Sequence, residues 1–170
     1  LNGVYLSKLD IDNYFDTINH ERLFTRLANW LKDDETLRLI RLCIQTGIVT
    51  PQLQWQEINK GVPQGAILSP LLANFYLHPF DQFAANKVPM YIRYADDFLI
   101  ATSTEKQIKE AVELVKEELE SQFYLQLNTP IIHNFHDGIE FLGITISDTG
   151  HPSQKKRKRR YKRESIQSNL

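Results

Sequence analysis

Three aspartates lie beside apolar stretches of the kind that form strands. Asp96 and Asp97 are adjacent and separate YIRY (91–94) from FLI (98–100). Asp10 ends another apolar stretch, just before a segment rich in aromatic residues. Neighbouring carboxylates repel each other, and a hard divalent cation such as Mg²⁺ relieves that repulsion because it prefers carboxylate oxygens. For the adjacent pair taken alone, an exposed acidic turn is the alternative.

Strand pairing could bring all three aspartates together. Strands at about 89–94 and 98–102 flank the adjacent pair and predict a hairpin whose tip can turn both carboxylates to one side. If the strand that ends at Asp10 lies beside this hairpin, three carboxylates converge. Such a trio can hold two metal ions, an arrangement that suits phosphoryl transfer to a 3′-hydroxyl with pyrophosphate as the leaving group.

Periodicity predicts the elements that must position these residues. Apolar residues recur at helical spacing in four segments, which predict helices beginning near residues 19, 33, 69 and 104. Ser69 and Pro70 are typical of an N-cap and a first helical residue, and Thr104 with Gln107 of a capping box. Pro79 should kink its helix or begin a new turn. Strands are expected at 1–9, 52–60, 89–94, 98–102, 123–127 and 139–146. The order predicts an α+β fold with helices packed on one face of a mostly antiparallel sheet.

The composition is that of an ordinary globular chain. Its 170 residues, 42% hydrophobic and 24% charged, fit one domain or one piece of a longer protein. The single cysteine, Cys43, excludes an internal disulfide framework and a cysteine-based zinc site. No apolar run reaches the roughly 18 residues that a membrane span needs, and no signal peptide is visible. We therefore expect an intracellular setting and no membrane partner.

The net charge of −1 averages two unlike parts of the chain. Residues 1–154 carry 12 basic and 20 acidic side chains, whereas residues 155–163 hold eight basic ones. This asymmetry predicts a polyanionic partner for the tail, and a solvated, disordered terminus is the other interpretation. The candidate nucleic-acid-binding residues are Lys155, Lys156, Arg157, Lys158, Arg159 and Arg160.

Four blocks resemble, in order, the motifs of reverse transcriptases, especially the bacterial branch related to group II introns. Motif A is similar to residues 8–18 (KLDIDNYFDTI), motif B to 61–74 (GVPQGAILSPLLAN), motif C to 91–98 (YIRYADDF), and the short block after motif D to 141–143 (FLG). The resemblance covers nearly all of residues 4–146. Four blocks in the same order are far more specific than any one of them.

The resemblance implies a polymerase palm over residues 1–148, without the fingers and most of the thumb. Residues 149–170 would be a basic tail or the start of a thumb or linker. The implied activity is RNA-directed DNA polymerisation, in which deoxynucleotides are added to the 3′-hydroxyl of a DNA or RNA primer on an RNA template. Other domains of a longer parent chain, including maturase or CRISPR integrase domains, would be further partners, in a bacterial cytoplasm.

The resemblance also assigns the metal ligands. It implies that Asp10, Asp96 and Asp97 are catalytic and bind two Mg²⁺ ions, for which Mn²⁺ is a substitute, with the Ile11 carbonyl as an extra ligand. The family usually carries a lysine after a Leu-Asn pair in motif D, and none follows Asn128 here. No residue is therefore assigned to protonate pyrophosphate from this position.

Phe15, Gln64 and Gly65 are the nucleotide-binding residues that the resemblance implies. Phe15 matches a bulky residue under the sugar, whose ring would exclude a 2′-hydroxyl; from the sequence alone, core packing is the alternative. Gln64 matches a glutamine along the nucleotide and template, and Gly65 would permit close backbone approach. Arg93 is a weaker candidate for this site than these three residues, because a role as charge partner of the acidic cluster explains it equally well.

Two other classes share the palm: an inactive scaffold that binds nucleic acid and an RNA-directed RNA polymerase. The intact carboxylates argue against the first, and Phe15 with Ala95 favours a reverse transcriptase over the second. The five histidines show no metal-ligand spacing or nucleophile partner, which argues against a hydrolase. Gln64 and Pro70 argue against the diversity-generating group, so intron maturases and CRISPR-associated reverse transcriptases stay open.

Overall fold

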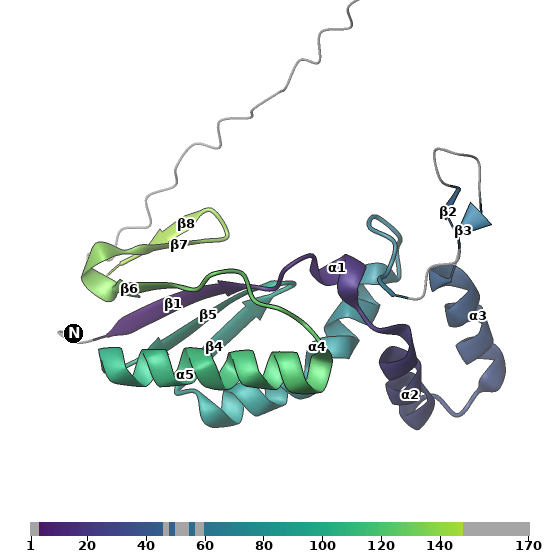
Figure 1. Cartoon of the computed structure of the whole chain (residues 1–170), viewed down its shortest axis with the longest axis horizontal. Helices are drawn as coiled ribbons and strands as arrows, with labels where there is room; N and C mark the ends of the chain where they lie inside the picture. Colours follow the sequence, from purple (N-terminus) through teal and green to yellow (C-terminus); the bar gives the residue numbers. More distant parts are fainter. Residues whose placement is uncertain (1–3, 46–47, 50–54, 57–59, 148–170) are drawn as a thin grey trace, which may run out of the picture.

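The centre of the molecule is a four-stranded antiparallel sheet (Figure 1). The structure is a computed structural model that describes residues 4–45, 48–49, 55–56 and 60–147. Its strand order is β4 (Met90–Tyr94), β5 (Asp97–Thr102), β1 (Tyr5–Asp10) and β6 (Ile131–Asn134). Every neighbouring pair is antiparallel, so the first strand of the chain lies inside the sheet beside the hairpin formed by β4 and β5.

Helices cover one face of this sheet, as predicted. Figure 1 shows α4 (Ser69–Lys87) and α5 (Glu105–Glu118) along that face, and a hairpin of β7 (Ile139–Phe141) and β8 (Ile144–Ile146) over the other. Alternation along the strands supplies apolar side chains to both sides. The main core contains Leu9, Phe98 and Ile100, whereas the cluster under the small hairpin contains Leu6, Leu99 and Ala101.

Three helices continue from the end of β1. They are α1 (Tyr14–Thr17), α2 (His20–Trp30) and α3 (Asp34–Ile44). The side chains of Asn19, Asp33 and Thr104 cap α2, α3 and α5 by accepting a backbone N–H. The predicted starts of these three helices are therefore confirmed. No helix among the described residues is both long and apolar enough to cross a membrane.

Helix α4 departs from its prediction at its N-terminus. Leu68 is the N-cap and Ser69 is the first helical residue, so the N-cap prediction for Ser69 is wrong. The Ser69 hydroxyl donates instead to the carbonyl of Pro63, which joins the preceding loop to the helix. The helix continues through Pro79, which lies at an exposed position inside it.

The strand predicted at 123–127 is wrong. Of this segment only Phe123 belongs to η1 (Leu119–Phe123), a π-helical turn that extends α5 and ends at Tyr124 with φ 57°. Leu127 then forms a single antiparallel bridge with Ile11. The prediction at 139–146 was one strand, but Leu142 and Gly143 both have positive φ and form a tight turn between β7 and β8. The preceding polar segment is η2 (Phe135–Asp137), a 3₁₀ turn.

Two further predictions fall partly or wholly outside the described residues. Of the strand expected at 52–60, the structure describes β3 (Trp55–Gln56), which pairs with β2 (Ile48–Val49), and a single bridge at Lys60. The basic tail, from Lys155 to Arg160, lies outside the described residues.

Candidate active site

The sheet register brings Asp10 and Asp97 face to face. These residues are direct partners in the pairing of β1 with β5, at the end of the sheet next to α1 (Figure 1). Alternation places both on the side of Leu6 and Leu99, away from α4 and α5. Asp96 precedes β5 in the turn, and its carbonyl accepts the Ile11 N–H at 3.2 Å. The backbone therefore brings the three predicted aspartates to one place.

The charge at this place is unbalanced. Partial burial raises the pKa of the Asp10 carboxyl, a hydrogen bond from Asn128 opposes the rise, and the negative charges of Asp96 and Asp97 add to it. Lys8 also opposes it, but its Nζ lies 3.2 Å from the Oδ1 of Asp97. Like charges directly opposite each other destabilise a sheet. A bound cation would remove that repulsion.

The donor set fits a divalent cation in chemistry and backbone placement. In the part of the chain that the structure describes, no three His, Cys, Asp or Glu side chains stand close enough together to hold a metal ion. Asp97 is turned to Lys8, and one Asp10 oxygen accepts from Asn128 Nδ2 at 2.7 Å. Carboxylate oxygens are the ligands that Mg²⁺ prefers, so binding requires these side chains to rotate from their present partners. Ile11 as a whole is only 1% exposed, and because its side chain carries no ligand atom, its backbone carbonyl is the one oxygen that it could offer a cation.

Backbone hydrogen bonds fasten the motif B loop to the segment after Asp10. Val62 donates its N–H to the Phe15 carbonyl and Gly61 donates to the Ile18 carbonyl, both at 2.7 Å. The Nε2 of Gln64 lies 3.3 Å from both carboxylate oxygens of Asp16. The predicted nucleotide-binding residues Phe15 and Gln64 thus lie on adjoining segments.

Phe15 and Gly65 differ in what surrounds them. The Phe15 ring is half-buried, packs against the main core and meets Tyr14 edge-on at 5.6 Å between centroids. The ring therefore keeps part of its surface exposed. Gly65 has φ +88°, and a Cβ built there would meet nothing within 4 Å. Its backbone conformation explains the glycine, and no part of the described chain approaches it closely.

Sequence reasoning missed the partners of two residues. Asn128 holds Asp10 twice, through its side chain and through a backbone N–H that donates to the Asp10 carbonyl at 2.9 Å. The Leu127-Asn128 pair, which matches the Leu-Asn pair of motif D, was a signal in the sequence that could have pointed to Asn128. Arg93 pairs with Asp81 on α4 and not with the acidic cluster. Nothing local in the sequence indicates that pairing, because it depends on which way β4 faces.

Comparison with known proteins gives consistent matches. The family described as "Reverse transcriptase (RNA-dependent DNA polymerase)" matches residues 2–146. Protein YkfC of Escherichia coli K12 is 29% identical over 83% of this chain and 46% of its own length. The retron Ec83 reverse transcriptase of Escherichia coli is 27% identical over 94% of this chain and 53% of its own length. The group II intron-encoded protein LtrA of Lactococcus lactis is 40% identical over 44% of this chain and 12% of its own length. The chain thus spans about half, or less, of the length of these relatives.

Solved structures share the fold. An apo telomerase from Candida tropicalis, truncated from its C-terminal domain, superposes with a TM-score of 0.69 at 18% identity, over 91% of this chain and 36% of that one. A foamy viral protease–reverse transcriptase in complex with an RNA/DNA hybrid superposes with a TM-score of 0.52 at 22% identity, over 86% of this chain and 16% of that one. At such identities the likeness concerns the fold alone. Since the family match spans most of the sequence and the relatives include a retron enzyme and an intron-encoded protein, the chain belongs to the reverse transcriptase family, in its group II intron-like branch.

Proposed function

We propose that this chain is the catalytic palm of an RNA-directed DNA polymerase. The proposed reaction is transfer of a nucleotide from a deoxynucleoside triphosphate to a primer 3′-hydroxyl on an RNA template. The observation that carries the proposal is the direct opposition of Asp10 and Asp97 in the β1–β5 register, with Asp96 in the adjoining turn. A structural sheet gains nothing from opposed carboxylates, whereas a phosphoryl-transfer site needs them.

In the proposed mechanism, Asp10, Asp96 and Asp97 hold two Mg²⁺ ions, or Mn²⁺ ions in their place. Bound metal would supply activation of the attacking hydroxyl and neutralisation of the charge that develops on the phosphates. The protein holds the Asp10 carboxylate in place through Asn128 and balances Asp97 through Lys8 when no cation is bound. These contacts therefore keep both carboxylates partnered when no cation is bound, and the side chains would exchange them for the cation on binding.

The nucleotide would lie against the joined segments of motifs A and B. Phe15 would contact the sugar from below, and Gln64 would exchange its contact with Asp16 for one with the nucleotide or template. The basic tail from Lys155 to Arg160 would add contacts to nucleic-acid phosphates that do not depend on sequence. Template, primer, the other domains of the parent and a bacterial cytoplasm belong to this proposal. The reverse transcriptase family match supports the template and primer, and the share of the relatives that the chain covers supports the further domains.

Primer extension by the full-length parent protein tests the proposal. With Mg²⁺ and deoxynucleotides, we expect a labelled DNA or RNA primer to be extended on an RNA template. Extension with ribonucleotides alone would instead indicate an RNA polymerase. Nucleic-acid binding without any extension, with either Mg²⁺ or Mn²⁺, would indicate a scaffold and would overturn the proposal.

Replacing Phe15 by alanine should relax sugar selection. The half-buried ring would no longer clash with a 2′-hydroxyl, so incorporation of ribonucleotides relative to deoxynucleotides should rise by about tenfold or more. Single-nucleotide incorporation with each substrate measures the ratio. Phe75→Ala is the matched control, because Phe75 is also half-buried and packs on the same core, but contacts Trp30. Equal ratios in the two variants would show that Phe15 serves only core packing.

A further inference from the structure

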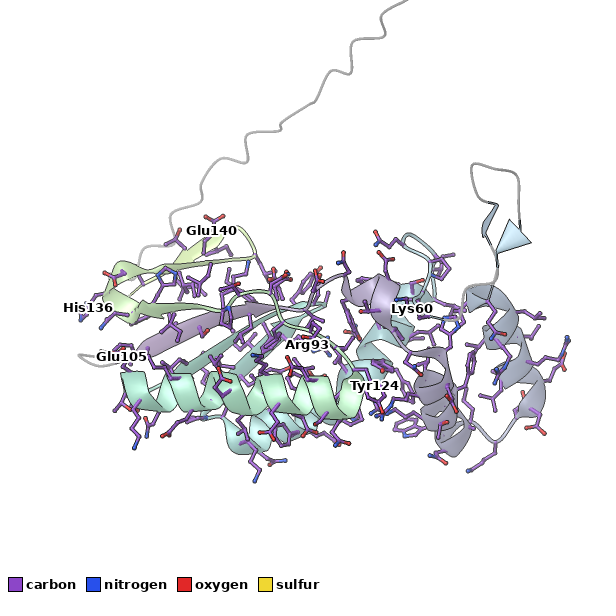
Figure 2. All side chains as sticks on the ribbon, in the orientation of Figure 1. Lys60, Arg93, Glu105, Tyr124, His136 and Glu140 are labelled. Atoms are coloured by element: carbon purple, nitrogen blue, oxygen red, sulfur yellow. The ribbon has the colours of Figure 1, made fainter. Side chains whose placement is uncertain are left out.

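A partly buried ion pair lies next to the turn that carries Asp96. Arg93, on β4, has a side chain only 8% exposed. Its Nε and Nη2 each lie 2.6 Å from one carboxylate oxygen of Asp81, on α4. The Tyr91 hydroxyl donates to the same carboxylate at 2.7 Å. Figure 2 shows Arg93 between the sheet and the helices, near the end of the sheet that faces α1.

The remaining guanidinium nitrogen of Arg93 reaches the turn itself. Nη1 donates to the Ala95 carbonyl at 2.7 Å and to the Asn74 side-chain oxygen at 3.0 Å. Ala95 has φ 56°, a conformation that residues with a Cβ adopt rarely. Its carbonyl belongs to the peptide that joins Ala95 to Asp96. The hydrogen bond from Arg93 thus holds the peptide immediately before a proposed metal ligand.

The same side chain connects this turn with the motif B loop. Asn74 and Asp81 both lie on α4, and that helix begins at Ser69, whose hydroxyl is bonded to Pro63 beside Gln64. A planar guanidinium can serve Asp81, Asn74 and the Ala95 carbonyl together, because its donors point in fixed directions. An ammonium group offers no such fork. The contact set therefore depends on arginine and not on positive charge alone.

We propose that Arg93 is a positioning residue of the active site, which fixes the Ala95–Asp96 peptide and ties it to α4. Asp81 holds the guanidinium in place from the helix side. This inference rests on the proposed polymerase function wherever it is tested by nucleotide incorporation. It adds a requirement that the function alone does not contain: the orientation of Asp96 depends on a side chain that touches neither substrate nor metal.

The test compares Arg93→Met and Arg93→Lys with Arg26→Met in the full-length parent protein. Arg26 is a suitable control because it is also partly buried and donates to a carbonyl of α4, that of Tyr76, while its guanidinium lies over Phe123. We expect Arg93→Met to lower kcat by about 10- to 100-fold, with KM for the deoxynucleotide changed by less than about threefold. Arg93→Lys should recover only a small part of the loss, and Arg26→Met should stay close to the parent.

A second measurement does not require turnover. Mn²⁺ binding to the full-length protein without nucleic acid, followed by electron paramagnetic resonance, should weaken by about tenfold or more in Arg93→Met and stay unchanged in Arg26→Met. If Arg93→Met fails to fold, Asp81→Asn replaces it, since an amide keeps the volume and one acceptor; the same losses are expected in smaller degree. If kcat and Mn²⁺ affinity fall no further than in Arg26→Met, the inference is overturned. An inactive parent protein would overturn the proposed function instead, and the Mn²⁺ comparison would still decide the role of Arg93.

Discussion

Asp10→Asn is expected to abolish nucleotide incorporation and, in metal-free buffer, to stabilise the fold. An amide at this position still accepts the hydrogen bond from Asn128, so local packing is kept. It removes one of two carboxylates that face each other across β1 and β5. Activity should fall on the order of 1,000-fold or more, because a neutral ligand does not balance the metal charge. Stability at pH 7 should rise by up to about 1 kcal/mol.

The sign of the stability change follows from the pKa of Asp10. Burial and the neighbouring carboxylates raise that pKa above its ordinary value of 3.8, so the folded protein binds a proton more tightly than the unfolded chain does. The contribution of Asp10 to the stability of the unchanged protein therefore falls as pH rises from 3.8 through the folded-state pKa. Below pH 3.8 the advantage of Asp10→Asn should disappear. Urea unfolding at a series of pH values, with EDTA present, measures this difference.

Added Mg²⁺ should reverse the comparison. A cation that binds only the folded state stabilises it, so the unchanged protein should gain stability while Asp10→Asn gains much less. Asp137→Asn, in the 3₁₀ turn η2 after β6, is the control for loss of a carboxylate elsewhere. If Asp10→Asn is destabilised in EDTA, or responds to Mg²⁺ as the control does, the carboxylates do not form a metal site.

Gly61→Ala should produce the largest loss of stability among single changes outside the core. Gly61 has φ +84°, and a Cβ added there would lie 2.9 Å from the carbonyl oxygen of Asp16. That oxygen is backbone, and the adjoining segment is fastened by the bond from the Gly61 N–H to the Ile18 carbonyl, so neither side can move without breaking it. Strain from the positive φ and the overpacking together should cost about 2–4 kcal/mol.

Gly65→Ala separates the two contributions. Gly65 has nearly the same φ, +88°, but a Cβ there meets nothing within 4 Å. The change should therefore cost only the conformational strain, about 1–2 kcal/mol. Urea midpoints of the two variants, compared at equal m-value, measure the difference. Equal losses would show that the approach of Asp16 to Gly61 does not constrain the loop.

The turn that carries Asp96 and Asp97 could be predicted from local rules, whereas the pairing of the strand of Asp10 with this hairpin was only a condition of the prediction, supported by the resemblance. Alternation along a strand and a short hairpin leave few ways to arrange β1, β4 and β5. The extent of a strand at 123–127 could not be predicted, because alternating Phe123, Leu125 and Leu127 suits a strand, whereas Phe123 ends η1 and Leu127 makes only a single bridge to Ile11. The first two of these residues are buried against the core in the structure. Periodicity does not say which partner supplies the burial.

Side-chain partners across long sequence separations were beyond prediction for a different reason. The bond from Asn128 to Asp10 spans 118 residues, and its existence depends on how the segment after η1 crosses the end of β1. The pairing of Arg93 with Asp81 depends on the face of β4 that meets α4. Both follow from the packing of whole elements, which no local pattern specifies.

The alternation of Leu9 and Asp10 has a consequence for insertions and deletions. If β1 slipped by one residue against β5, Leu9 would leave the main core and Asp10 would enter it. Losing the burial of Leu9 would cost about 1.5–3 kcal/mol, and burying an unpaired carboxylate would cost more. A misaligned chain with an intact core but separated carboxylates therefore does not compete with the native one. Deletion of one residue from β1 should therefore impair folding, and not only catalysis. A change of side-chain volume at Leu9, by contrast, leaves the two carboxylates aligned.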